Sequence, residues 1–168
     1  TYKAVVFGAT GTDTGDYHLR FSYPPPLVAD SNEEDDSWET ASDLGLVSGV
    51  TRVAGQSIDL ANDDDWYQFQ LADWGSPGDF LEVQFEHERG NLGVVLYEKS
   101  GDEFIPIWYA DGTSDIEHID LAELAPINYY AQVYGLGETN PSYERVISQR
   151  RELVVDRFEP NDLSNASL

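Results

Sequence analysis

The sequence contains no cysteine and no methionine, and only 9 of its 168 residues are lysine or arginine. The absence of cysteine excludes disulfide bonds and thiol chemistry. Because 32 residues are aspartate or glutamate, the net charge is −23, and nucleic acid is excluded as a partner since its binding needs clustered basic side chains. Divalent cations, a salty environment or basic partners are the counterparts that such a charge favours.

Long hydrophobic runs are also missing from the sequence. A helix that spans a membrane needs about 18 or more consecutive apolar residues, and the chain has no such run, so we expect no membrane insertion. Hydrophobic residues nevertheless make up 40% of the chain and aromatic residues 12%, which is too much for a disordered protein. We therefore expect a folded domain with a sizeable core.

Short segments rich in β-branched and aromatic residues recur along the chain, separated by glycine, aspartate, asparagine and proline. This spacing predicts an all-β protein, an antiparallel β-sandwich. In the segment DWYQFQL, alternation places Tyr67 and Phe69 on one face of a central strand and Trp66 on the other. The predicted strands are 2–7, 17–22, 46–53, 65–71, 79–86, 92–98, 103–109, 127–134 and 142–148.

The sequence also repeats itself. YKAVVFG at 2–8 matches YYAQVYG at 129–135 with an offset of 127, and residues 17–36 match 143–162 with an offset of 126. The one-residue change falls in loops, where insertions are tolerated. We interpret the chain as one complete module of a tandem array, with parts of the two neighbouring modules.

This repeat predicts four parts. Residues 1–23 are expected to be the terminal strands of a preceding module, because a two-stranded hairpin alone is marginal in water. Residues 24–29 begin with three prolines and are expected to form a stiff linker. Residues 30–149 form one complete module, and 150–168 are a linker and the start of the next.

Several motifs together resemble the bacterial pre-peptidase C-terminal (PPC) domain family, which includes the collagen-binding domains of clostridial collagenases. They are EPND at 159–162, DDDWYQFQL at 63–71, YYAQVYG at 129–135 and a late strand that begins with tyrosine. The resemblance covers 30–149 as a full copy. It implies a jelly-roll-like β-sandwich, and a secreted, mostly non-catalytic domain that is often repeated and often binds calcium.

Acidic residues cluster before two of the predicted strands. Five of the seven residues from Asp30 to Asp36 are acidic, and a second cluster occupies Asp63 to Asp65. Calcium binds six to eight oxygen ligands, and so many carboxylates on one turn repel each other unless a cation or solvent screens them. Two interpretations stay open, a calcium site and a solvated acidic loop.

The resemblance to the PPC family assigns the ligands. It implies that Glu33, Asp35 and Asp36 correspond to the Glu, Asn and Asp of EPND, and that Asp63 and Asp65 join them around one ion. Glu34 stands where the family has proline, and Asp35 where it has asparagine. For the next module, the same role is expected of Glu159, Asn161 and Asp162.

Two functions remain open, and neither is an enzyme. The first is a calcium-stabilised structural or adhesive module on the bacterial cell surface or outside the cell, whose partners are neighbouring copies in the same chain or in other subunits. The second is an accessory domain that attaches a secreted hydrolase to an extracellular polymer, collagen or polysaccharide, through exposed aromatic residues such as Trp66, Trp74 and Trp108. The flanking copies at a fixed period favour the first.

Overall fold

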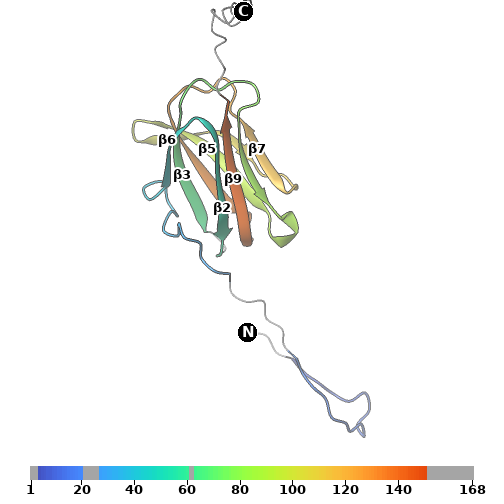
Figure 1. Ribbon diagram of the computed structural model, residues 1–168. Coiled ribbons are helices and arrows are strands. Elements are labelled where there is room, and N and C mark those ends of the chain that lie inside the picture. Colours follow the sequence, from blue (N-terminus) through green and yellow to red (C-terminus); the bar gives the residue numbers. More distant parts are fainter. Residues whose placement is uncertain (1–3, 21–26, 61–62, 151–168) are drawn as a thin grey trace, which may run out of the picture.

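The computed structural model describes residues 4–20, 27–60 and 63–150 of the chain, and the regular structure in them is almost wholly β (Figure 1). In this part of the chain the one helical element is a short 3-10 turn, His87–Arg89, so no helix there could cross a membrane. The strands are β1 (Ser42–Val47), β2 (Gly49–Ile58), β3 (Asp64–Leu71), β4 (Phe80–Phe85), β5 (Leu92–Ser100), β6 (Glu103–Ala110), β7 (Ile116–Asp120), β8 (Asn128–Gly135) and β9 (Asn140–Gln149).

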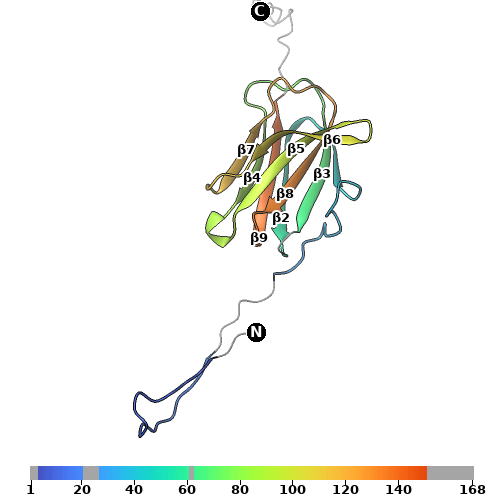
Figure 2. The same ribbon diagram turned by 180° about the vertical axis from the view of Figure 1, so that it is seen from behind.

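The strands form two sheets that pack as the layers of a sandwich (Figures 1 and 2). One sheet has the order β1-β3-β8-β5-β6 and the other β2-β9-β4-β7. All neighbouring pairs are antiparallel except β1 and β3, which run parallel. The predicted β-sandwich is confirmed, and the parallel pair arises because β2 crosses to the other sheet before β3 returns beside β1.

One predicted strand merges the end of β1 with β2, and β7 was absent from the prediction. The predicted strand 46–53 runs from the end of β1 into β2, and the chain changes sheets at Gly49, whose φ is +102°. β1 carries Gly45 at φ +66° and a break in its register with β3, so it lacks clean alternation. β7 is five residues long and largely polar, so its sequence cannot be distinguished from that of a loop.

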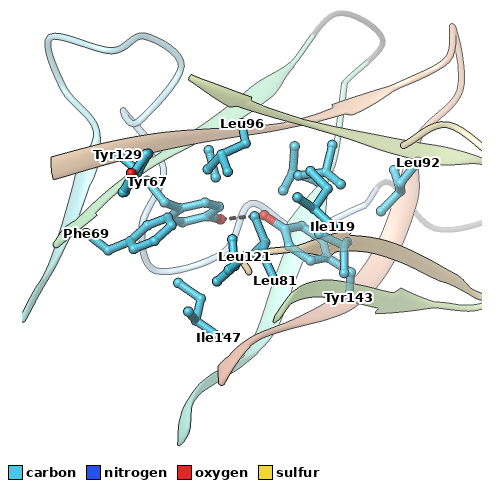
Figure 3. Close-up of a cluster of buried hydrophobic side chains, with 14 of the residues drawn as sticks. Tyr67, Phe69, Leu81, Leu92, Leu96, Ile119, Leu121, Tyr129, Tyr143 and Ile147 are labelled. Atoms are coloured by element: carbon cyan, nitrogen blue, oxygen red, sulfur yellow. Dashed lines mark hydrogen bonds between the residues drawn. The ribbon is translucent and has the colours of Figure 1, made fainter. Parts of the chain in front are cut away.

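Alternation along β3 places its apolar side chains as predicted. Tyr67, Phe69 and Leu71 are fully buried between the sheets, whereas Trp66 lies on the outer face, where its ring stacks on Tyr97 at 5.1 Å between centroids. The core also takes side chains from both sheets (Figure 3), among them Leu81, Leu92, Leu96, Ile119, Leu121, Tyr129, Tyr143 and Ile147. β3 is an interior strand, flanked by β1 and β8.

Residues 4–20 lie outside the sandwich. Every residue in this range is exposed and none belongs to a strand, so the strands predicted at 2–7 and 17–22 are not present at their described residues. The loop between them is held by a turn in which the Thr10 amide donates to Asp13 Oδ2 at 2.7 Å. Without neighbouring strands the two arms have no sheet to join, and their assignment to a preceding module stays a prediction.

Phe69→Ala tests the core. Phe69 is fully buried, and its ring lies 5.9 Å from that of Tyr129, so truncation should leave a cavity and cost about 3–5 kcal/mol of unfolding free energy in urea. Trp74→Ala is the control, because Trp74 is 61% exposed and its loss should change stability by no more than about 0.5 kcal/mol. Equal effects of the two substitutions would contradict the fold.

Candidate metal centre

The candidate site lies where the chain joins the sandwich, in the loop before β1. Asp30 ties this loop to β2, because its carboxylate accepts from the amides of Asn32 and Ser57, both at 2.7 Å. The Asp30 amide in turn donates to Glu33 Oε1 at 3.0 Å. These bonds make a compact turn from the acidic residues and fix its position against the sheet.

Three of the predicted ligands come together at this turn. Glu33, Asp36 and Asp63 each place one carboxylate oxygen within 4.8 Å of the others. Asp36 is exposed, Glu33 is half-buried, and Asp63 is buried directly before β3, where its Oδ2 accepts from the Asp59 amide at 3.2 Å. We call these three residues the acidic trio. Their oxygens are of the kind that calcium prefers, and the trio could hold a divalent cation.

The other two predicted ligands, Asp35 and Asp65, are buried and make hydrogen bonds within the protein. Asp35 Oδ2 accepts from the Ser42 hydroxyl at 2.9 Å, and the Asp35 carbonyl accepts from the Trp66 amide at 2.8 Å. Asp65 Oδ2 accepts from the hydroxyls of Tyr143 and Tyr67. Neither side chain belongs to the acidic trio.

The remaining predicted ligands, Glu159, Asn161 and Asp162, lie outside the described residues. Glu34, which stands where the PPC motif has proline, has a φ of +98°. Proline is restricted to φ near −65°, so the loop here adopts a backbone that an E-P-N-D sequence could not take. The change from proline therefore alters the shape of the turn and not only its composition.

Burial and mutual repulsion set the protonation of these acids. Desolvation is the largest cause in each case, and it raises the pKa of Asp65 to about 8 and those of Asp35 and Asp63 to about 6. It also raises the pKa of Glu33, with smaller contributions from nearby carboxylates. Without a cation, the folded protein thus holds protons that these groups would release in water.

A polar network that the sequence did not indicate surrounds Asp65. The Tyr67 and Tyr143 hydroxyls hydrogen-bond to each other across the two sheets (Figure 3), and the single proton of Tyr67 is shared among Tyr143, Asp65 and Gln56, whose Oε1 lies at 3.2 Å. Gln56 accepts in addition from Asn32 in the acidic loop, at 2.8 Å. In the sequence, the one indication of this network was that Tyr143 recurs as Tyr17 in the repeat.

Two solved structures are similar to the chain. The pre-peptidase C-terminal domain of collagenase from Bacillus anthracis is 20% identical, over 63% of this chain and 93% of that one, with a TM-score of 0.45. PliG of Aeromonas hydrophila, a periplasmic inhibitor of g-type lysozyme, is 19% identical, over 65% and 99%, with a TM-score of 0.41. No protein-family model and no curated protein matches. The resemblance to the PPC domain is one of fold.

The raised pKa values predict how stability depends on pH in the presence of a chelator. A carboxyl group whose pKa is higher in the folded state makes stability fall as pH rises from its unfolded pKa to its folded pKa. For Asp65 this range runs from about 4 to about 8, and each pKa unit is worth about 1.4 kcal/mol. The unfolding free energy in urea should therefore decrease from pH 4 to pH 8.

Asp65→Asn should remove the part of this decrease that extends to pH 8, because an amide does not titrate and can still accept from Tyr143. The control is Asp102→Asn, at an exposed aspartate in the β5–β6 turn, which should follow the wild-type curve. A wild-type curve that is flat between pH 4 and pH 8, or one that Asp65→Asn leaves unchanged, would contradict the burial of this carboxyl group.

Proposed function

We propose that residues 30–149 form a non-catalytic structural and adhesive module of an extracellular bacterial protein, stabilised by calcium and joined head to tail to other copies. The acidic trio carries this proposal. Three carboxylate oxygens within 4.8 Å of one another repel strongly in a partly buried site unless a cation lies between them. A cation there would clamp the loop that leads into the module to the start of β3.

The composition of the trio favours calcium at extracellular concentration. Calcium needs six to eight oxygens, so three carboxylates leave positions for backbone carbonyls and water. A site with few dedicated ligands is weak, and calcium sites of extracellular modules have dissociation constants of about 10⁻⁴–10⁻³ M. Such a site is filled outside the cell. Glu159, Asn161 and Asp162 would form the equivalent site of the next module.

The exposed segment 4–20 supports assembly. Its apolar side chains lie in water, with Val5 78%, Phe7 84% and Tyr17 64% exposed. The sequence repeat aligns this segment with β8 and β9, which in this module have strands on both sides. A neighbouring module would bury the segment by strand addition. Residues 1–23 carry two bases and two acids, so they are not repelled by an acidic partner.

A second candidate is an accessory domain that binds an extracellular polymer for a secreted hydrolase. It is favoured by aromatic side chains on the edge strand β6, where Trp108 is 56% and Tyr109 74% exposed. Exposed aromatic residues of this kind are typical of binding surfaces. This candidate gives no role to residues 1–23, and for this reason we prefer the first.

Thermal unfolding with calcium and with chelator tests whether the acidic trio binds calcium. A ligand that binds only the folded state stabilises it, by about 2.7 kcal/mol at one hundred times its dissociation constant. The melting temperature should therefore rise with calcium, and Glu33→Gln/Asp63→Asn should abolish the rise. Experiments in about 0.15 M salt screen the diffuse attraction of cations to the net charge.

The matched control for this experiment is Glu88→Gln, at an exposed glutamate far from the trio in sequence, which should keep the full calcium response. An identical melting temperature with calcium and with chelator would leave the solvated acidic loop as the correct interpretation.

Assembly is tested by light scattering of concentrated protein in calcium. The whole chain should associate, and a chain without residues 1–23 should stay monomeric, because it lacks the exposed apolar side chains of this segment. Val5→Asp/Phe7→Asp should behave like the shortened chain, whereas Thr12→Asp in the turn should not. A whole chain that stays monomeric, with residues 1–23 protected from hydrogen exchange, would mean that they fold back onto their own sandwich.

A further inference from the structure

The chain enters the sandwich at one end and leaves it at the opposite end (Figures 1 and 2). Before β1, the carbonyl of Asp35 accepts from the amide of Trp66 near the start of β3, at 2.8 Å. At the other end, the side chain of Gln149 accepts from the amide of Ala72, directly after β3, at 2.8 Å. The two points are therefore separated by the length of β3, which is eight residues or about 25 Å.

The first and last strands lie along the line between these two points. β1 runs parallel to β3, from Ser42 opposite Tyr67 to Val47 opposite Leu71. β9 ends at Gln149, beside the start of β2, and lies between β2 and β4 in its sheet. If the chain were pulled from both sides, β1 would be drawn toward the entry end and β9 toward the exit end, each along its own length.

The direction of such a pull decides how the hydrogen bonds between strands are loaded. These bonds run across the strands, so a pull along the strands loads the bonds of a pair together. A pull across the sheet instead breaks the same bonds one after another from one end. Forced unfolding is governed by the rate of unfolding, and a barrier that requires several bonds to break at once is crossed more slowly. The sandwich should therefore resist a pull along the chain better than a pull across its sheets.

Two buried polar side chains fasten the end of β9, and neither belongs to the candidate metal centre. Gln149 is 3% exposed, its Oε1 accepts from the Ala72 amide, and its Nε2 donates to the Asp73 carbonyl at 2.5 Å. Asp79 is 1% exposed, and its Oδ1 accepts from the Arg150 amide at 2.6 Å. These bonds join the last two described residues of the chain to the loop between β3 and β4. We call Gln149 and Asp79 the exit clamp.

The chain is also fastened where it enters. The Ser57 hydroxyl donates to the Val28 carbonyl at 3.2 Å, and the Ser57 amide donates to the Asp30 carboxylate at 2.7 Å. The bond between Asp35 and Trp66 follows, and only then does β1 begin. Force on the entering chain would thus pass to β2 and β3 as well as to β1.

We infer that the sandwich bears tension along the chain, with β1 and β9 loaded lengthwise and with the exit clamp holding the end of β9. The partners of this function are the polypeptide segments on either side, between which the module transmits force. Tension arises only if the chain is anchored on both sides, as in the head-to-tail arrangement proposed above, and to this extent the inference rests on the proposed function. It requires neither bound calcium nor strand addition.

Single-molecule force spectroscopy in two directions, in chelator, tests the inference. Because the chain has no cysteine, introduced cysteines are unique attachment points. Thr1→Cys/Leu168→Cys pulls along the chain. Thr1→Cys/Thr113→Cys pulls on the exposed loop after the edge strand β6, at the entry end, because Ala110 lies in one row with Asp65.

At equal loading rates, the unfolding force should be several-fold higher along the chain than across the sheet, and the gain in contour length identifies unfolding of the module. Equal forces in the two directions, or a higher force across the sheet, overturn the inference. This comparison leaves the strands and the exit clamp unaltered, so it does not depend on whether a core variant folds.

Gln149→Met tests the exit clamp, because it removes both side-chain hydrogen bonds at similar size. It should lower the force along the chain by a larger fraction than the force across the sheet, since the second pull does not load the end of β9. Gln70→Met makes the same change at an exposed position near the end of β3 and should lower neither force. If Gln149→Met does not fold, Asp79→Asn is measured in the same way, because its single carbonyl oxygen cannot replace both carboxylate oxygens.

A loss of the same fraction in both directions overturns the clamp, since the role of these side chains would then be stability alone. The calcium site is judged separately by the melting temperatures described above. A high force along the chain in a protein without a calcium response supports the inference and contradicts the calcium site. A calcium response with equal forces in the two directions supports the site and overturns the inference.

Discussion

The hydrogen bond between the Tyr67 and Tyr143 hydroxyls joins the two sheets at the end of the sandwich where the chain enters. Asp65 accepts from Tyr143 and lies 3.3 Å from the Tyr67 hydroxyl, so a carboxyl group is fixed in the interior, where the charged form is costly. The acidic loop is bound to the same network through Asn32 and Gln56. The burial of carboxyl groups at this end of the sandwich explains both their raised pKa values and the polar network around them.

Such a site is stable only if its charge is compensated, by bound protons or by a cation. Protons compensate Asp65, whose pKa is raised to about 8 by burial. A divalent cation would compensate the trio at the surface, where Asp36 is open to solvent. A module whose acidic trio needs a calcium ion would be most stable outside the cell, where the calcium concentration is high.

The sequence predicted the sandwich because β-rich segments recur along it and alternation is strong in β3 and β4, but it missed β7 and most of β1, which lack this alternation. The acidic trio was also within the prediction, because the resemblance to the PPC family implied that Glu33, Asp36 and Asp63 share one site. Asp65 turns inward because it alternates with Trp66 and shares a face of β3 with Tyr67, but its partner Tyr143 is 78 residues away and is not indicated by any local pattern. Asp35 lies in a loop, where no alternation indicates which side chains turn inward. Arg145 is buried although a charged residue in a strand is usually expected to face solvent, so its burial could not be predicted either.

The central claim is that the trio binds one divalent ion. Equilibrium dialysis against 2 mM calcium in about 0.15 M salt with excess magnesium, followed by measurement of calcium per chain, tests it most directly. The account predicts one bound calcium per complete module in wild type and in Asp65→Asn, and none in Glu33→Gln/Asp63→Asn. Calcium no higher in the protein compartment than outside it, or a bound amount that the double substitution leaves unchanged, would contradict the account.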